Sequence, residues 1–113
     1  MISSKHIVIT GGASGLGLEL VRQLHNGNQI SVIARPSHGL DMLRSDYPDL
    51  EVYEADLADL RSVEIAADQL IRSDRKIDIL INNAAVQNTP RFIDPDFRYE
   101  TIQREIDINF TSV

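Results

Sequence analysis

The sequence contains no cysteine or tryptophan and only three histidines in 113 residues. Without cysteine, the chain has no disulfide, no thiolate metal ligand and no cysteine nucleophile, which fits a reducing compartment. The histidines, His6, His25 and His38, are widely scattered. None is paired with an aspartate or serine in a pattern that predicts a catalytic triad or a metal site. We therefore expect no metal.

Basic residues and long apolar runs are also scarce. Lysine and arginine number 11 against 17 acidic residues, which gives a net charge of -6. Because nucleic-acid binding rests on basic side chains that neutralise phosphates, we expect no nucleic-acid partner. No apolar stretch approaches the roughly 18 residues of a membrane span. The first residues, MISSKHIVITGG, offer no signal peptide. We expect a cytoplasmic protein that does not associate with membranes.

Short apolar runs alternate with helical patterns along the chain. The runs predict strands, and the spacing of leucine, isoleucine and valine between them predicts helices. A strand–helix alternation at this spacing indicates parallel βαβ units and therefore the α/β class. We read residues 1–113 as one domain. The expected strands are residues 6–10, 30–34, 51–55 and 77–82, and the expected helices include Leu16, Leu20, Val21 and Leu24, then residues 40–44, then Leu60, Val63, Ala67, Leu70 and Ile71, with Asp59 as a cap.

A glycine-rich segment, TGGASGLG at residues 10–17, joins the first strand to the first helix. A helix N-terminus at such a turn presents unpaired amides and the positive end of the helix dipole. Glycines let the backbone approach a pyrophosphate closely. The spacing is not Gly-x-Gly-x-x-Gly, and no P-loop Lys-Ser/Thr pair follows. The alternative is a turn that only packs the helix against the sheet. Because the segment follows a predicted strand and begins a predicted helix, it favours nucleotide-phosphate binding.

The end of the second strand bears on the choice of nucleotide. Dinucleotide-binding folds commonly place an acidic residue about 20 residues after the loop, where it binds the ribose 2′-hydroxyl. This chain has Ala34 and Arg35 there. Arginine suits a 2′-phosphate, through ion pairing and through stacking on the adenine. The sequence thus predicts NADP in preference to NAD. The alternative is a solvated surface arginine.

Four short motifs follow one another along the chain: Thr10-Gly11-x-x-x-Gly15-x-Gly17, Asp56-Leu57, Asn82-Asn83-Ala84-Ala85 and Ile108-Asn109-Phe110. Together they resemble the short-chain dehydrogenase/reductase family over essentially the whole chain. The resemblance implies a Rossmann-type parallel sheet of order 3-2-1-4 with flanking helices. It also implies an NAD(P)-dependent oxidoreductase that interconverts small-molecule carbonyls and alcohols.

The resemblance implies roles for individual residues. Arg35 matches the position of NADP-preferring members, and Asn82 would steady the central strands. Ala85 stands where the family usually has glycine, so a positive φ there would be strained. The alternative role for Asp56 is to cap a helix, and the alternative role for Asn82 and Asn83 is to form turns. The remaining implied roles are pyrophosphate and ribose binding by Gly11, Ser14, Gly15, Leu16 and Gly17, adenine binding by Asp56 and Leu57, ribose contacts by Asn83 and Ala84, and support of a proton-relay water by Asn109.

The family's catalytic serine and Tyr-x-x-x-Lys pair find no match in the chain. None of its tyrosines, Tyr47, Tyr53 and Tyr99, is followed four residues later by lysine. In the family, that tyrosine is the general acid and base of hydride transfer. We therefore expect the cofactor-binding half of such an enzyme, incomplete at its C-terminus and inactive alone. The alternative is a non-catalytic nucleotide-sensing or dimerisation module, and the gene sequence beyond the Val113 codon would distinguish the two.

The predicted fourth strand, residues 77–82, would be an apolar sheet edge in this arrangement. An unpaired apolar edge is a template for pairing with another chain. We therefore expect the chain to form homo-oligomers, through this edge or through the last helical pattern of the chain, which consists of Ile102, Ile106, Phe110 and Val113.

Overall fold

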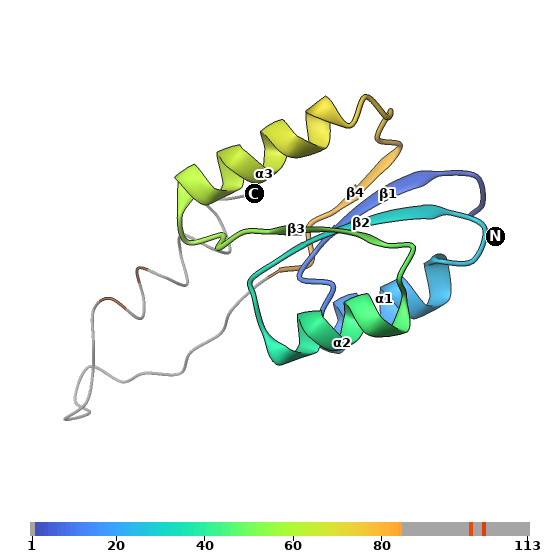
Figure 1. The fold of residues 1–113 in the computed structure, drawn as a ribbon, viewed down its shortest axis with the longest axis horizontal. Coiled ribbons are helices and arrows are strands. Elements are labelled where there is room, and N and C mark those ends of the chain that lie inside the picture. The colour runs from blue at the N-terminus through green and yellow to red at the C-terminus, as the bar shows by residue number, and fades with distance from the viewer. Residues whose placement is uncertain (1, 85–99, 101–102, 104–113) are drawn as a thin grey trace.

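The computed structural model describes residues 2–84, 100 and 103. Its centre is a parallel sheet of order β3-β2-β1-β4 (Figure 1). The predicted α/β class and strand order are confirmed. The strands are β1 (His6–Thr10), β2 (Gln29–Ala34), β3 (Glu51–Glu54) and β4 (Ile79–Ile81).

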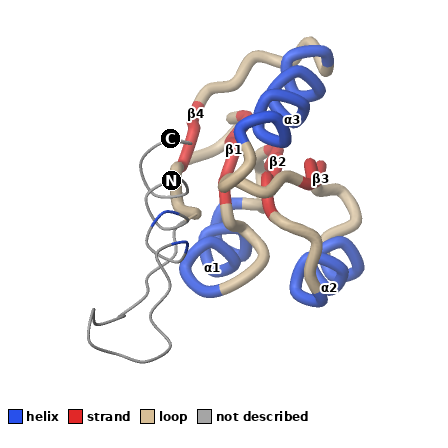
Figure 2. Tube along the Cα trace, turned by 90° about the vertical axis from the view of Figure 1, so that its left-hand side faces the viewer, coloured by secondary structure: helices blue, strands red, loops and turns tan. Residues whose placement is uncertain are grey.

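Helices cover both faces of this sheet. Helices α1 (Gly15–Leu24) and α2 (His38–Asp46) lie on one face, and α3 (Leu60–Arg72) lies on the other (Figure 2). Ser37 caps α2 by accepting a hydrogen bond from the Leu40 amide, at 3.1 Å. Asp59 caps α3 by accepting one from the Arg61 amide, also at 3.1 Å. Side-chain oxygens at these positions satisfy amides that have no partner inside the helix, and the predicted cap at Asp59 is confirmed.

Strand β1 is the central element of the core. All five of its residues are buried, and it pairs with β2 on one side and β4 on the other. Ile9, for example, aligns with Val32 of β2 and with Ile81 of β4. Its β-branched side chains suit a strand buried on both faces. The same core continues into the helices through Val21, Leu40 and Leu43.

The apolar side of α3 is narrower than its leucine and isoleucine spacing predicts. Ala66 and Leu70 are buried, but Leu60 is 52% exposed and Ile71 is 71% exposed. Within residues 2–84, α3 is the one helix on its face of the sheet, so only a strip of it contacts the strands (Figure 2). In the described part of the chain, no helix has the length and apolarity needed to cross a membrane.

Asp78, the residue before β4, binds the amino end of β1 through two hydrogen bonds. Its Oδ2 accepts a hydrogen bond from the His6 amide at 2.9 Å, and its own amide donates to the His6 carbonyl at 2.9 Å. The hydrogen bond from the His6 amide holds the pKa of the Asp78 carboxyl below its ordinary value, with smaller contributions from the charges of Lys5 and Lys76. The folded chain therefore favours the ionised form of Asp78.

A pH dependence of stability follows from this lowered pKa. Asp78→Asn keeps an oxygen that accepts from the His6 amide but removes the charge. We expect wild type to be more stable than the variant above about pH 4, the ordinary range of an aspartate, and this difference to vanish as the pH falls through the lower folded-state pKa. Urea unfolding of both proteins between neutral and acid pH measures it. A difference that stays constant over this range would contradict the assignment.

Candidate functional site

A cleft of about 430 Å³ opens at the carboxyl ends of the four strands. Open parallel sheets place ligands at this edge, and the volume lies within the usual range of small-molecule sites. The cleft is bordered by the β1–α1 loop, the β2–α2 and β3–α3 connections, and the end of β4. Eight of the residues expected from the sequence line it: Gly11, Ser14, Leu16, Arg35, Asp56, Leu57, Asn83 and Ala84.

The three glycines of the motif have different surroundings. Gly15 has a φ of 55°, and a Cβ built on it would meet no atom within 4 Å. Gly11 has a φ of 71°, and its Cβ would lie 2.9 Å from the Ala84 Cα. A Cβ on Gly17 would overlap the Gly11 carbonyl oxygen and lie 2.5 Å from Asn83 Nδ2. Gly11 and Gly17 thus allow the loop to pack against the end of β4, whereas Gly15 leaves open space.

Thr10 joins the glycine loop to the residues after β4. Its Oγ1 accepts hydrogen bonds from the amides of Asn83 and Ala84, both at 3.0 Å. Asn83 Nδ2 in turn donates to the Gly11 carbonyl at 3.2 Å. Asn83, rather than the exposed Asn82, therefore makes the side-chain bond that holds this end of β4 to the loop.

The N-terminus of α1 faces the same cleft. Ser14 occupies the N-cap position, and its side chain makes no capping hydrogen bond. It lines the cleft together with Leu16, which is 69% exposed. Leu16 thus lies outside the apolar face that the leucine spacing predicts for α1. The cleft combines unpaired helix amides, a hydroxyl and an apolar side chain, which suits an anionic ligand with apolar parts.

The β2–α2 connection contributes a cation to the cleft. Arg35 directly follows β2 and is exposed at the cleft wall. Over residues 2–84, 100 and 103, no carboxylate forms an ion pair with its guanidinium. Pro36 and Ser37 line the cleft beside it. Neither residue was predicted as part of the site, although a serine just before an apolar helical pattern is a recognised helix-start signal.

The β3–α3 connection supplies the acidic side of the cleft. Asp56 Oδ1 accepts a hydrogen bond from the Ala58 amide at 3.0 Å, and the Asp56 amide donates to Ser62 Oγ at 3.0 Å. Asp56 therefore shapes the turn before α3, while the cap itself is Asp59. Leu57 lines the cleft next to it.

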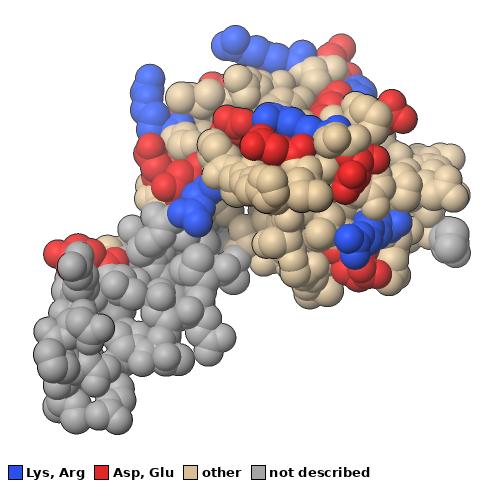
Figure 3. Space-filling model, turned by 60° about the horizontal axis from the view of Figure 1, so that its bottom comes forward, with Lys and Arg blue, Asp and Glu red and all other residues tan. Residues whose placement is uncertain are grey.

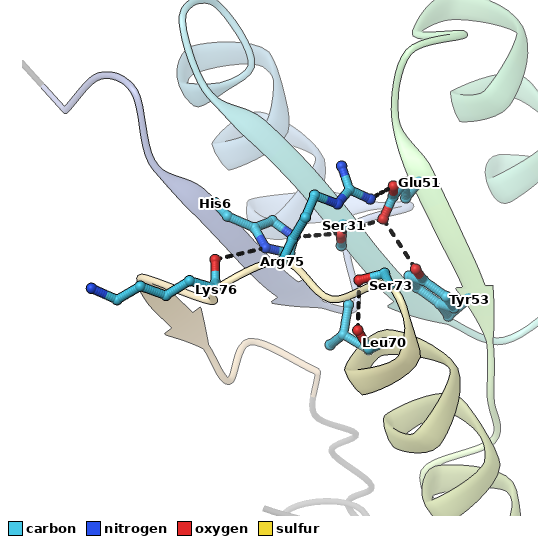
Figure 4. Close-up of polar contacts among 8 residues, drawn as sticks. All are labelled: His6, Ser31, Glu51, Tyr53, Leu70, Ser73, Arg75 and Lys76. Carbon is cyan, nitrogen blue, oxygen red and sulfur yellow. Dashed lines mark hydrogen bonds and ion pairs between the residues drawn. The ribbon is translucent and has the colours of Figure 1, made fainter.

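A Ser-His-Glu cluster lies at the opposite, amino-terminal end of the sheet (Figure 4). His6 Nε2 is 2.8 Å from Ser31 Oγ, and Ser31 Oγ donates to Glu51 Oε2 at 3.2 Å. A catalytic triad needs an acid on the other ring nitrogen and a serine that substrate can reach. Here Nδ1 faces the Lys76 carbonyl at 3.1 Å, and Ser31 is fully buried. The cluster is therefore structural.

Two further contacts extend this cluster. Tyr53 donates its hydroxyl to Glu51 at 3.0 Å, and Arg75 forms an ion pair with the same carboxylate (Figure 4). The Tyr53 bond lies within β3, and the Arg75 ion pair connects β3 to the segment between α3 and β4. The cluster was not visible in the sequence, because its members come from three strands and one connection. In the described part of the chain, no three acidic or histidine side chains form a group that would hold a metal.

Two of the expected site residues, Ala85 and Asn109, lie outside the described residues.

The sheet order, the glycine loop and the cleft define a Rossmann-type α/β protein. The family model described as short chain dehydrogenase matches residues 5–113, and the chain belongs to this family. The resemblance seen in the sequence is thereby confirmed. A curated relative, 3alpha-hydroxysteroid dehydrogenase of Mediterraneibacter gnavus, is 28% identical over 121 residues, covering 100% of this chain and 47% of the relative.

Solved structures share the fold. An NADPH-bound carbonyl reductase from chicken fatty liver superposes with a TM-score of 0.80 at 20% identity, covering 98% of this chain and 48% of the other. A 3-ketoacyl-(acyl-carrier-protein) reductase from Brucella melitensis, complexed with NADH, gives 0.81 at 23% identity, covering 99% and 46%. The chain thus spans about half the length of these three proteins.

Proposed function

We propose that this chain is the cofactor-binding part of an NADP(H)-dependent oxidoreductase that interconverts small-molecule carbonyls and alcohols. The observation that carries the choice of NADP is Arg35, which stands at the end of β2 in the cleft wall without an ion-pair partner in the described part of the chain. A guanidinium there favours a nucleotide with an additional phosphate on the adenosine ribose.

The residues of the cleft fit such a nucleotide. Gly15 does not itself line the cleft but stands between two residues that do, Ser14 and Leu16, and has open space beside it. This space and the amides at the start of α1 suit the pyrophosphate. Asp56 and Leu57 would hold the adenine, and Asn83 with Ala84 would contact the adjoining ribose. Gly17 would act by keeping the loop packed against Asn83. When bound, the nicotinamide supplies or accepts the hydride, so this chain's own part is to bind and orient the adenosine half.

Relatives support the reaction class. One is a hydroxysteroid dehydrogenase, and two structural neighbours are a carbonyl reductase and a 3-ketoacyl reductase. Their names describe chemistry at a carbonyl or an alcohol. One neighbour is bound to NADPH and another is complexed with NADH, so the choice of NADP rests on Arg35. Ala85 and Asn109 belong to this proposal as a cofactor contact and as support for a proton-relay water.

Calorimetric titration of the chain with NADP and with NAD tests the proposal. We expect NADP to bind at least tenfold more tightly, since the 2′-phosphate adds charge-assisted hydrogen bonds of about 1.5–3 kcal/mol. Tighter NAD binding would overturn the choice of cofactor, and no binding of either would overturn the function. Because the chain has no Tyr-x-x-x-Lys sequence, we also propose that these 113 residues alone are inactive. NADPH-dependent reduction of any carbonyl by this chain would contradict the proposed inactivity.

We also propose a cytoplasmic homo-oligomer that does not bind nucleic acid. The net charge of -6 supports the last point, as does the face drawn in Figure 3, on which basic side chains are interspersed with acidic ones. Self-association is supported by β4, which pairs within the described residues on one side only, and by Leu80, which is 57% exposed.

Leu80→Lys tests the self-association. We expect wild type to elute as a dimer or larger and the variant to shift toward monomer, because a charge on an edge strand opposes pairing with another chain. Size-exclusion chromatography with light scattering measures both masses. Met42→Lys, at an exposed position of α2, is the matched control and should leave the mass unchanged. A stable wild-type monomer at high concentration would contradict the proposal.

A further inference from the structure

The first turn of α2 lies directly against the glycine loop. A Cβ built on Gly39 would be 2.9 Å from the Ala13 carbonyl oxygen and 3.9 Å from the Ala13 carbonyl carbon. The nearest obstacle is therefore backbone, which has no rotamer by which to move away. The contact requires glycine for its small size.

The two segments that meet at this contact both line the cleft. Ala13 and Ser14 border it from the glycine loop, and Pro36 and Ser37 border it from the connection before α2. A change in the spacing between Ala13 and Gly39 therefore changes the distance across the cleft at this end.

Helix α2 has little freedom to move in other directions. Ser37 Oγ accepts a hydrogen bond from the Leu40 amide at 3.1 Å, and the Leu40 side chain is fully buried in the core. Pro36 restricts its own φ and disfavours helical backbone at Arg35. With the start of α2 held in this way, the contact between residue 39 and the Ala13 carbonyl sets the distance between α2 and the glycine loop.

We propose that Gly39 is a positioning residue that sets the width of the nucleotide cleft between the glycine loop and the β2–α2 connection. It acts through Ala13 and Ser37. The ligand part of this inference rests on the proposed function, whereas the packing part does not.

Gly39→Ala in the full chain tests the proposal, with Ser45→Ala, at an exposed position of the same helix, as the control. Alanine favours helix over glycine. If residue 39 had free space, the variant would melt at a higher temperature and bind NADP as wild type does, which would overturn the proposal. We expect a lower melting temperature and at least fivefold weaker NADP binding, with wild-type NADP affinity in the control.

NMR measurements on ligand-free wild type and Gly39→Ala separate this proposal from the proposed function. In Gly39→Ala, the Ala13 and Ser14 amide signals should shift, and unchanged signals would overturn the proposal. If wild type binds neither NADP nor NAD, the proposed function fails and the cleft-width proposal fails with it, while these measurements still decide the packing.

Discussion

Gly17→Ala is expected to abolish nucleotide binding and to destabilise the ligand-free chain. The new Cβ would overlap the Gly11 carbonyl oxygen and lie 2.5 Å from Asn83 Nδ2. Both α1 and the residues after β4 would have to move apart, and overpacking of this kind destabilises by about 1–3 kcal/mol. The bond from Asn83 to Gly11 would be lost as well. Urea unfolding and calorimetric titration with NADP measure the two effects.

Gly15→Ala is the matched control for this prediction. Its Cβ would point into open space, so the only effect on the empty protein is strain from a φ of 55°, about 1 kcal/mol. The space that the Cβ fills is the space assigned to the pyrophosphate. We therefore expect Gly15→Ala to weaken NADP binding with a smaller loss of stability than Gly17→Ala. Wild-type stability and affinity in Gly17→Ala would contradict the packing described for the loop.

Arg35→Ala is expected to weaken NADP binding about 10- to 100-fold and to leave NAD binding nearly unchanged. The reason is the loss of charge-assisted hydrogen bonds to a phosphate that NAD lacks, at about 1.4 kcal/mol for each factor of ten. Arg35 is exposed, so the fold should not change. Competition titrations with the two nucleotides measure the ratio of their dissociation constants.

Arg35→Lys separates charge from shape at the same position. Lysine keeps the positive charge but lacks the planar fork that binds two phosphate oxygens at once. We expect an NADP affinity between those of wild type and Arg35→Ala. An equal loss for NADP and NAD in Arg35→Ala would mean that the guanidinium contacts a part common to both nucleotides, and it would remove the argument for NADP.

The α/β class and the location of the site were predictable from the residue pattern, and the strand order was predictable from the family resemblance. Alternating apolar runs and helical patterns imply parallel βαβ units, and parallel strands bring all their carboxyl ends to one edge. Arg35, Asp56 and Asn83 follow three different strands, so they had to lie close together once the sheet order was known. Strand lengths were less predictable, since β4 covers Ile79–Ile81 rather than residues 77–82.

Other features depend on distances in the folded structure, which the spacing of residues along the sequence does not give. The periodicity of α1 groups Leu16 with the apolar face of the helix, whereas Leu16 is 69% exposed and lines the cleft. The motif cannot show which glycine faces open space, because Gly15 and Gly17 differ only in what lies opposite them. The contact of His6 with Ser31 depends on the register of β1 against β2, where His6 pairs with Gln29.

The hydroxyl of Thr10 has a consequence for how the cleft assembles during folding. It accepts hydrogen bonds from residues 73 and 74 positions further along the chain. Closing a loop of this length carries a length-dependent entropic cost of about 4 kcal/mol, so the β2 side of the cleft can form while the β4 side is still open. A ligand that contacts both sides binds only the closed form. At 100 times its dissociation constant, it would stabilise that form by about 2.7 kcal/mol, so cofactor supply would govern how long the chain survives proteolysis.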